Sequence, residues 1–274
     1  MITFKNTNSY MSLDAWVMAN VVQLWTDHFC SRFVSGDPRY RLHQPADRRA
    51  GYPDNIPAYV QYDPTGRQYD QMTQAARSGV ANIAEGSARH STSRTTELKL
   101  LDTALASIQE LKNDYNHFLL LFECTPWPKS DTHAVAIMRT DIQRANYTDD
   151  WDVEAAEHIL RQKALFAPYL QDTDAITSAR ALYLLCTKAI SMLQHLKEYR
   201  LEQFRQEGGF TENLSQDRNE TLAQQSAEQG APTCPICGAP MLMKTAQRGS
   251  HAGKRFWSCS NFLTTGCRGT RNID

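Results

Sequence analysis

The sequence predicts a mainly α-helical protein, an up-and-down four-helix bundle with an extra helical hairpin, followed by a small cysteine-rich β ribbon. Three observations carry this prediction. Apolar residues recur at helical spacing over most of residues 1–206, residues 207–231 turn polar, and four of the seven cysteines fall between positions 234 and 267. We therefore expect a bundle domain, a linker and a ribbon domain in that order.

The four long helices of the bundle follow from hydrophobic period and capping residues. A first helix is expected over residues 12–34 with Ser12 as its N-cap, and a second over residues 67–89, where small residues favour close helix packing. Ser93 is the expected N-cap of a third helix, which ends before the prolines at 126 and 128. The last long helix is expected from Asp174 to Gln206, before a glycine pair.

Two insertions interrupt the bundle. Residues 36–66 contain five prolines and have no helical period, so a long connection is expected there. Residues 124–173 hold two shorter helical periods, around residues 135–142 and 153–164, which predict the added helical hairpin.

Charge divides the C-terminal part of the chain into two segments. Residues 207–231 carry five acids and one arginine among many Gln, Ser, Asn and Thr residues, a composition typical of a flexible linker. Residues 232–274 carry six basic residues and one acid. Any attraction to phosphate is therefore expected at the C-terminus.

The cysteine spacing of residues 232–274 predicts a zinc ribbon. Cys234 and Cys237 form a Cys-x-x-Cys knuckle, 21 residues separate Cys237 from Cys259, and seven separate Cys259 from Cys267. Two knuckles that each supply two thiolates make the tetrahedral site that zinc prefers. We expect one structural Zn²⁺, and the alternative is four unrelated free cysteines.

Basic and aromatic residues alternate around these cysteines, which favours nucleic-acid binding. Aromatic rings can stack on bases and cationic side chains can neutralise phosphates. The alternatives are that single aromatics fill the core of the ribbon, or that the ribbon contacts only protein. The candidate nucleic-acid-binding residues are Lys244, Arg248, Lys254, Arg255, Phe256, Trp257, Phe262 and Arg268.

Three stretches of the ribbon resemble the C-terminal four-cysteine zinc finger of bacterial type I DNA topoisomerases. They are Cys-Pro-Ile-Cys-Gly-Ala-Pro-Met (234–241), Gly-Lys-Arg-Phe-Trp-Ser-Cys-Ser-Asn-Phe (253–262) and Gly-Cys (266–267). That family has a shorter gap in the second knuckle, so residues 263–265 are an addition here. The resemblance implies binding of single-stranded DNA.

The bundle resembles a second family, the four-helix-bundle proteins of ribosomal-RNA intervening sequences, which include accessory variability proteins of diversity-generating retroelements. The resemblance rests on Gln-Ala-Ala-Arg-Ser-Gly-Val-Ala-Asn-Ile-Ala-Glu-Gly (74–86), Arg89, Glu97 and Ala-Leu-Ala-Ser-Ile-Gln-Glu-Leu (104–111). It implies a homo-oligomer, often a pentameric ring, that binds nucleic acid and, in retroelements, a reverse transcriptase. The retroelement proteins are basic, whereas residues 1–206 are close to neutral.

These features lead to a hypothesis of a non-enzymatic nucleic-acid-binding accessory protein. The sequence contains no phosphate-binding glycine loop, nucleophile elbow or paired acids, so catalysis has no support from motifs. The alternatives are a scaffold whose bundle and ribbon bind only proteins, and a nuclease without a recognisable motif. The chain starts without a secretory pattern and has no long apolar run, which predicts a cytoplasmic location and no membrane contact.

Overall fold

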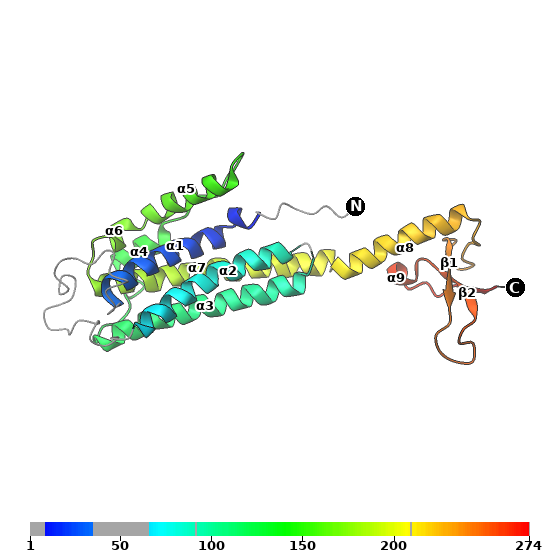
Figure 1. Ribbon diagram of the computed structural model, residues 1–274, viewed down its shortest axis with the longest axis horizontal. Helices are drawn as coiled ribbons and strands as arrows, with labels where there is room; N and C mark the ends of the chain where they lie inside the picture. The colour runs from blue at the N-terminus through cyan, green and yellow to red at the C-terminus, as the bar shows by residue number, and fades with distance from the viewer. Residues whose placement is uncertain (1–8, 35–65, 91, 209, 274) are drawn as a thin grey trace. The chain divides into compact units, whose positions relative to one another are not determined.

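The computed structural model describes residues 9–34, 66–90, 92–208 and 210–273. The chain divides into two compact units, Phe4–Gln206 and Glu207–Asp274. The first unit is helical and the second combines a helix with a small antiparallel sheet, which confirms the predicted fold class (Figure 1). Within the described ranges, no helix has both the length and the apolar character needed to cross a membrane.

The elements of the first unit are η1 (Ser9–Ser12), α1 (Asp14–Phe29), η2 (Cys30–Val34), α2 (Arg67–Arg89), α3 (Arg94–Leu121), α4 (Thr132–Arg139), α5 (Trp151–Ala164), α6 (Ala167–Leu170) and α7 (Ala175–Glu207).

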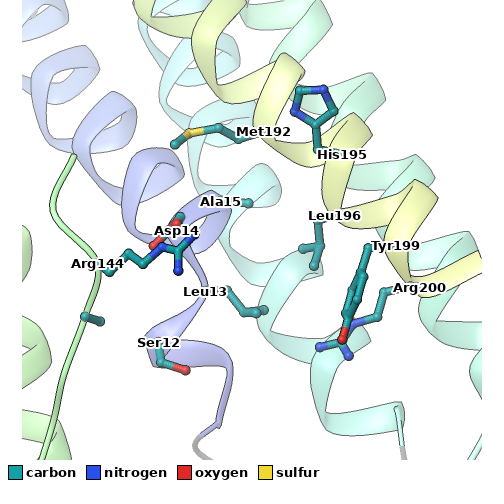
Figure 2. Close-up of a pocket in the computed structure, with 11 residues that line it drawn as sticks. Ser12, Leu13, Asp14, Ala15, Arg144, Met192, His195, Leu196, Tyr199 and Arg200 are labelled. Atoms are coloured by element: carbon teal, nitrogen blue, oxygen red, sulfur yellow. The ribbon is translucent and has the colours of Figure 1, made fainter. Parts of the chain in front are cut away.

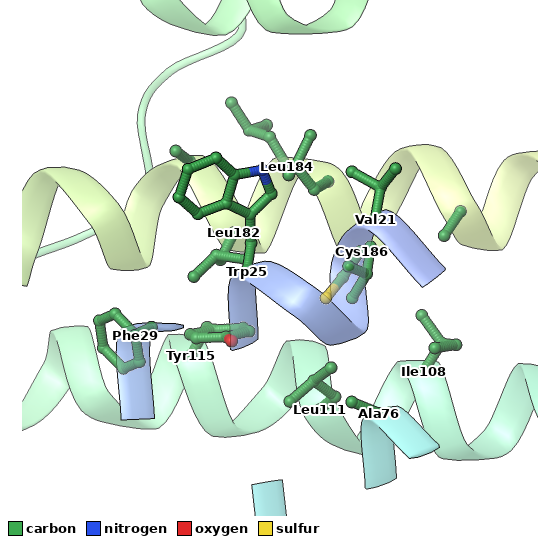
Figure 3. Packing of buried hydrophobic residues seen from close by; sticks show 14 of the residues in the cluster. Val21, Trp25, Phe29, Ala76, Ile108, Leu111, Tyr115, Leu182, Leu184 and Cys186 are labelled. Atoms are coloured by element: carbon green, nitrogen blue, oxygen red, sulfur yellow. The ribbon is translucent and has the colours of Figure 1, made fainter. Parts of the chain in front are cut away.

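Helices α1, α2, α3 and α7 enclose one continuous apolar core, in which side chains from all four helices meet (Figure 3). Phe29 of α1 packs edge-on against Tyr115 of α3, with ring centroids 5.3 Å apart. The Tyr115 hydroxyl is fully buried and donates a hydrogen bond to Thr26 Oγ1 over 2.8 Å. Because this hydroxyl has a partner, the core tolerates a polar atom at its centre.

Helices α2 and α3 form a close hairpin. At Gly79 a Cβ atom would lie 2.5 Å from Cδ1 of Ile108, so glycine at this position lets the Ile108 side chain pack directly against α2. Ser93 accepts the backbone N–H of Thr96 and caps α3, as predicted. Helix α2 ends at Arg89, so Gly86 lies inside the helix and not at its end.

The start of the first helix differs from the prediction. Leu13 and not Ser12 is the N-cap of α1, because Ser12 belongs to the preceding 3-10 turn. The helical run continues past α1 as the π-helical turn η2, which buries Phe33 and Val34 in the core. The connection expected over residues 36–66 lies, apart from Gly66, outside the described residues.

Helices α4 and α5 lie in the two stretches where the added helical hairpin was predicted, and residues 140–150 between them have no regular secondary structure. The indole of Trp25 in α1 donates to the carbonyl of Lys163 over 3.1 Å, and the ammonium of Lys163 lies 4.6 Å from the Trp25 ring. Gln162 is buried and accepts the backbone N–H of Gln143. These contacts fix the insertion against the bundle.

A buried ionic cluster joins three helical segments, and the sequence did not indicate it. Glu97 lies in the first turn of α3 and is 2% exposed. Its carboxylate lies 2.7 Å from Nδ1 of His90 and 3.1 Å from Nε of Arg200 in α7. The positive charge of Arg200 and the contact with the His90 ring offset the cost of burying this carboxylate.

The second unit begins with a helix where a flexible linker was expected. Helix α8 spans Phe210–Glu228, and the turn that follows it contains Gly230, whose φ is 78°. The backbone N–H of Ala231 then bonds to the carbonyl of Ser226, which closes the C-terminal cap. Helix α8 also packs against strand β1 (Met241–Thr245), and Asn219 donates to the carbonyl of Ser260. This helix therefore belongs to the C-terminal unit.

The sheet of the second unit has the order β1-β2-β3, with β2 (Arg255–Cys259) between β1 and β3 (Thr270–Asn272). Both pairings are antiparallel. Helix α9 (Phe262–Thr265) is a single turn between β2 and β3. The central strand delivers Cys259 at its end, and this residue pairs with Met241.

Candidate functional site

The first cysteine knuckle is a tight turn between residues 234 and 238. The backbone N–H of Ile236 points at Cys234 Sγ over 3.5 Å, and the N–H of Gly238 bonds to the Cys234 carbonyl over 2.9 Å. Gly238 has a φ of 74°, which favours glycine at the end of this turn. The knuckle thus presents Cys234 and Cys237 together.

The second knuckle repeats the same contact at the end of β2. The backbone N–H of Asn261 points at Cys259 Sγ over 3.4 Å. The turn α9 separates this knuckle's two cysteines, and Gly266 caps it with a φ of 71°. Cys267 follows directly, so the added turn preserves the position of the fourth thiol.

The four sulfur atoms lie at the spacing of a tetrahedral metal site. All four are within 4.8 Å of one another, with 3.8 Å between Cys234 and Cys267 and 3.4 Å between Cys237 and Cys259. Metal–sulfur bonds of about 2.3 Å in a tetrahedron place the sulfurs about 3.8 Å apart. The four cysteines predicted as ligands can therefore hold one metal ion.

The environments of the thiols differ. Burial raises the pKa of Cys234, but the backbone N–H groups of Cys237 and Ile236 stabilise its thiolate and bring the pKa to about 6. Burial, with the adjacent Cys237 thiol, raises the pKa of Cys259 to about 12. Thiolates this close repel one another, and a bound cation removes that repulsion.

Gly269 is a site residue that the sequence analysis missed. A Cβ atom at this position would overlap Cys234 Sγ. The carbonyl of Gly269 accepts the backbone N–H of Cys259 over 2.9 Å. Gly269 lies only two residues after Cys267. A glycine this close to a predicted metal ligand could have indicated that the backbone here packs against the thiols.

Strand alternation separates the candidate nucleic-acid-binding residues into two groups. Trp257 lies directly opposite Met243 and Arg271, so these three side chains share one face of the sheet, as does Arg255 by its spacing along β2. Phe256 lies opposite Lys244 on the other face. The Lys244 ammonium lies 5.9 Å from the Phe262 ring centroid. The eight candidates therefore do not form one surface.

The face that carries Trp257 is named here the Trp257 face, and it consists of Met243, Arg255, Trp257 and Arg271. Met243 is 48% exposed and both arginines are exposed, while Trp257 is half-buried against the cluster of Cys234, Met241 and Cys259. Each face of the sheet has two buried residues, Met241 and Cys259 on the Trp257 side and Leu242 and Ser258 on the other. The other side also carries exposed Lys244 and half-buried Phe256. Arg248 and Lys254 lie exposed in the turn between β1 and β2, and Arg268 is exposed after Cys267.

The helical unit contains a hollow of about 830 Å³ between the start of α1, the segment after α4, and α7. Asp14 and Arg144 lie next to each other on one side, and Tyr199 and Arg200 lie on the other (Figure 2). Burial raises the pKa of Asp14, and the charge of Arg144 acts in the opposite direction. Because Arg200 already pairs with Glu97, the charges around this hollow largely satisfy one another.

Four thiols at tetrahedral spacing and a sheet face with exposed arginines are the features that bear most directly on function. Comparison of the chain with protein-family models, curated proteins and solved structures finds no match. The chemistry of these residues therefore carries the functional inference.

Proposed function

We propose that this protein is a non-enzymatic accessory protein that binds single-stranded DNA or RNA through its C-terminal unit, which one structural Zn²⁺ folds. The observation that carries the proposal is the position of the Trp257 face beside the four clustered thiols. A homo-oligomeric bundle and a reverse transcriptase partner stay predictions from the resemblance stated above.

Zinc is the ion that this donor set fits best. A tetrahedral set of four cysteine sulfurs is typical of structural zinc or of iron–sulfur centres, and two short knuckles that bracket a ribbon favour the former. Since four protein thiolates fill the tetrahedron, no position is open for water or substrate. The ion would therefore supply folding energy and not catalysis.

The Trp257 face offers the two interactions that single-stranded nucleic acid needs. An aromatic ring can stack on a base for about 1–3 kcal/mol, and arginines can neutralise neighbouring phosphates. Trp257 lies directly opposite Arg271 across the sheet, and Arg255 lies two residues before it on the same strand. Met243 extends the apolar part of this surface on β1.

A salt titration of binding tests the proposal. Binding of a labelled single-stranded oligonucleotide to the full chain would be measured by fluorescence anisotropy at several salt concentrations. Each phosphate contact contributes about 0.7 to the logarithmic salt slope for a single strand. We expect the double variant Arg255→Ala/Arg271→Ala to reduce the slope by about 1.4.

A matched variant controls for net charge. Arg77→Ala/Lys99→Ala removes two exposed cations from α2 and α3 and should leave the slope unchanged. If the two double variants bind alike, the Trp257 face is not the contact surface. If the full chain does not bind and instead captures the same proteins before and after nuclease treatment, the protein is a scaffold.

A further inference from the structure

A second pocket in the helical unit has a different character from the hollow in Figure 2. It has a volume of about 560 Å³ and lies between α3, the segment before α4, α4 itself and α7. Its apolar lining includes Trp127, Met138 and Leu184. Both its size and its lining are typical of sites for small organic molecules.

Three cations line this pocket, and no acid does. They are Lys112 from α3, Lys129 from the segment before α4, and Arg139 from the last turn of α4. Among the described residues, no carboxylate lies within ion-pair distance of any of them. Three cations that line one pocket without a counter-ion repel one another, and a bound anion would relieve this repulsion. The hollow in Figure 2 lacks this property, because Arg200 is paired there.

The walls of the pocket include two aromatic rings. Trp127 is stacked on His133, with ring centroids 5.1 Å apart and an angle of 15° between the ring planes. The His133 ring therefore fixes the orientation of the indole. Lys112 places its ammonium 4.7 Å from the Tyr183 ring. Ala134 and Leu184 also line the pocket, and their side chains are buried, so they form its apolar floor. An apolar floor with aromatic walls selects flat, weakly hydrated groups.

We propose that this pocket binds a small organic anion with a flat apolar body, such as a mononucleotide or an aromatic carboxylate. The aromatic walls and the apolar floor would take the ring, and Lys112, Lys129 and Arg139 would take the negative group. A simple inorganic anion would leave the apolar walls uncovered. A neutral aromatic molecule would leave the three cations without a counter-ion. This site is independent of the metal centre and of the Trp257 face.

A pair of matched dyes tests the proposal on the full chain. Anilinonaphthalene sulfonate is a flat aromatic anion whose fluorescence rises in apolar sites, and N-phenylnaphthylamine has the same rings without the sulfonate. We expect the sulfonate to bind at least about tenfold more tightly than the neutral dye. Equal affinities would overturn the role of the cations.

Two variants with the same charge change locate the site. Lys129→Glu/Arg139→Glu should weaken binding of the sulfonate about tenfold or more. Arg77→Glu/Lys99→Glu, at exposed positions outside the pocket, should leave it unchanged. Circular dichroism verifies that both variants keep their helices. Equal binding by the two variants would place the dye elsewhere and overturn the proposal.

Filling the pocket and competing for it test the role of the apolar body. Met138→Trp adds bulk at a side chain that is 39% exposed, and it should abolish binding of both dyes. Adenosine monophosphate or benzoate should displace the sulfonate dye at concentrations where inorganic phosphate does not. Displacement by phosphate alone at the same concentration, or by none of the three, would overturn the proposal.

Discussion

The two compact units of this chain are stabilised by different physics. The helical unit buries a large apolar core that includes Phe29, Leu111, Tyr115 and Phe118. The buried apolar cluster of the C-terminal unit consists of Cys234, Met241 and Cys259, and two of these three are candidate metal ligands. Burial of apolar surface can stabilise the first unit, whereas the second needs another source of folding energy.

The difference in buried apolar surface determines what the stability of each unit depends on. A unit of this size has too little apolar surface to fold on burial alone, and metal coordination can supply on the order of 10 kcal/mol. Stability in the helical unit should therefore respond to changes in packing. Stability in the C-terminal unit should respond to the ion and to the geometry of the thiols.

Removal of the metal should produce the largest difference between the units. A strong chelator should unfold β1, β2 and β3 and leave α1 to α7 folded, because only the sheet depends on coordination. Hydrogen exchange followed by mass spectrometry resolves the two regions. Cys234→Ser should reproduce the loss, and Cys124→Ser, at a half-buried cysteine of the helical unit, is the control. Unchanged protection of the strands in chelator would show that the sheet folds without the metal.

Truncation in the helical core should give the reverse pattern. Leu111 is fully buried, so Leu111→Ala should lower the free energy of unfolding of the helical unit by about 2–5 kcal/mol. The metal content of the chain should stay the same. Urea unfolding followed by circular dichroism measures the first effect. Leu120→Ala on the same helix is the control, since Leu120 is 56% exposed.

A smaller effect, on the affinity for zinc, is expected at Gly269, whose backbone lies against the metal-ligating thiol of Cys234. Gly269→Ala would place a methyl group against Cys234 Sγ, and overpacking of this kind costs about 1–3 kcal/mol. The affinity for zinc, measured by competition with a chelating dye, should fall accordingly. The exposed neighbour Thr270→Ala should retain the original affinity. If both variants bind zinc alike, the contact with Gly269 has no energetic role.

The smallest effect concerns the helix that replaced the expected linker. Asn219→Ala removes the hydrogen bond to Ser260 and should destabilise the docking of α8 by about 0.5–1.5 kcal/mol. Faster amide exchange in α8 reports this change. Gln224→Ala, at an exposed position of the same helix, controls for helix propensity. Equal exchange in both variants would show that α8 does not depend on this contact.

The long helices and the four clustered thiols could be predicted from the sequence, because each leaves a local or regular signal. Apolar period marks α3 and α7, and the spacing of the cysteines marks the knuckles. Helix α8 left no such signal, since it has no apolar stripe and one of its contacts with the ribbon is a hydrogen bond from the polar residue Asn219 to Ser260.

Other features depend on contacts between distant parts of the chain. The burial of Glu97 requires Arg200, which lies on another helix far along the sequence. The division of the candidate nucleic-acid-binding residues into two faces follows from the register of β2, which sets Phe256 and Trp257 on opposite sides. Neither the partner nor the register can be read from local composition.

The metal content of the purified chain tests the central claim most directly. Elemental analysis by mass spectrometry should find one zinc per chain, and none in the double variant Cys234→Ser/Cys259→Ser. The C-terminal strands should be folded only in the first sample. A chain that contains no metal and still protects its strands from exchange would contradict the claim that coordination folds this unit.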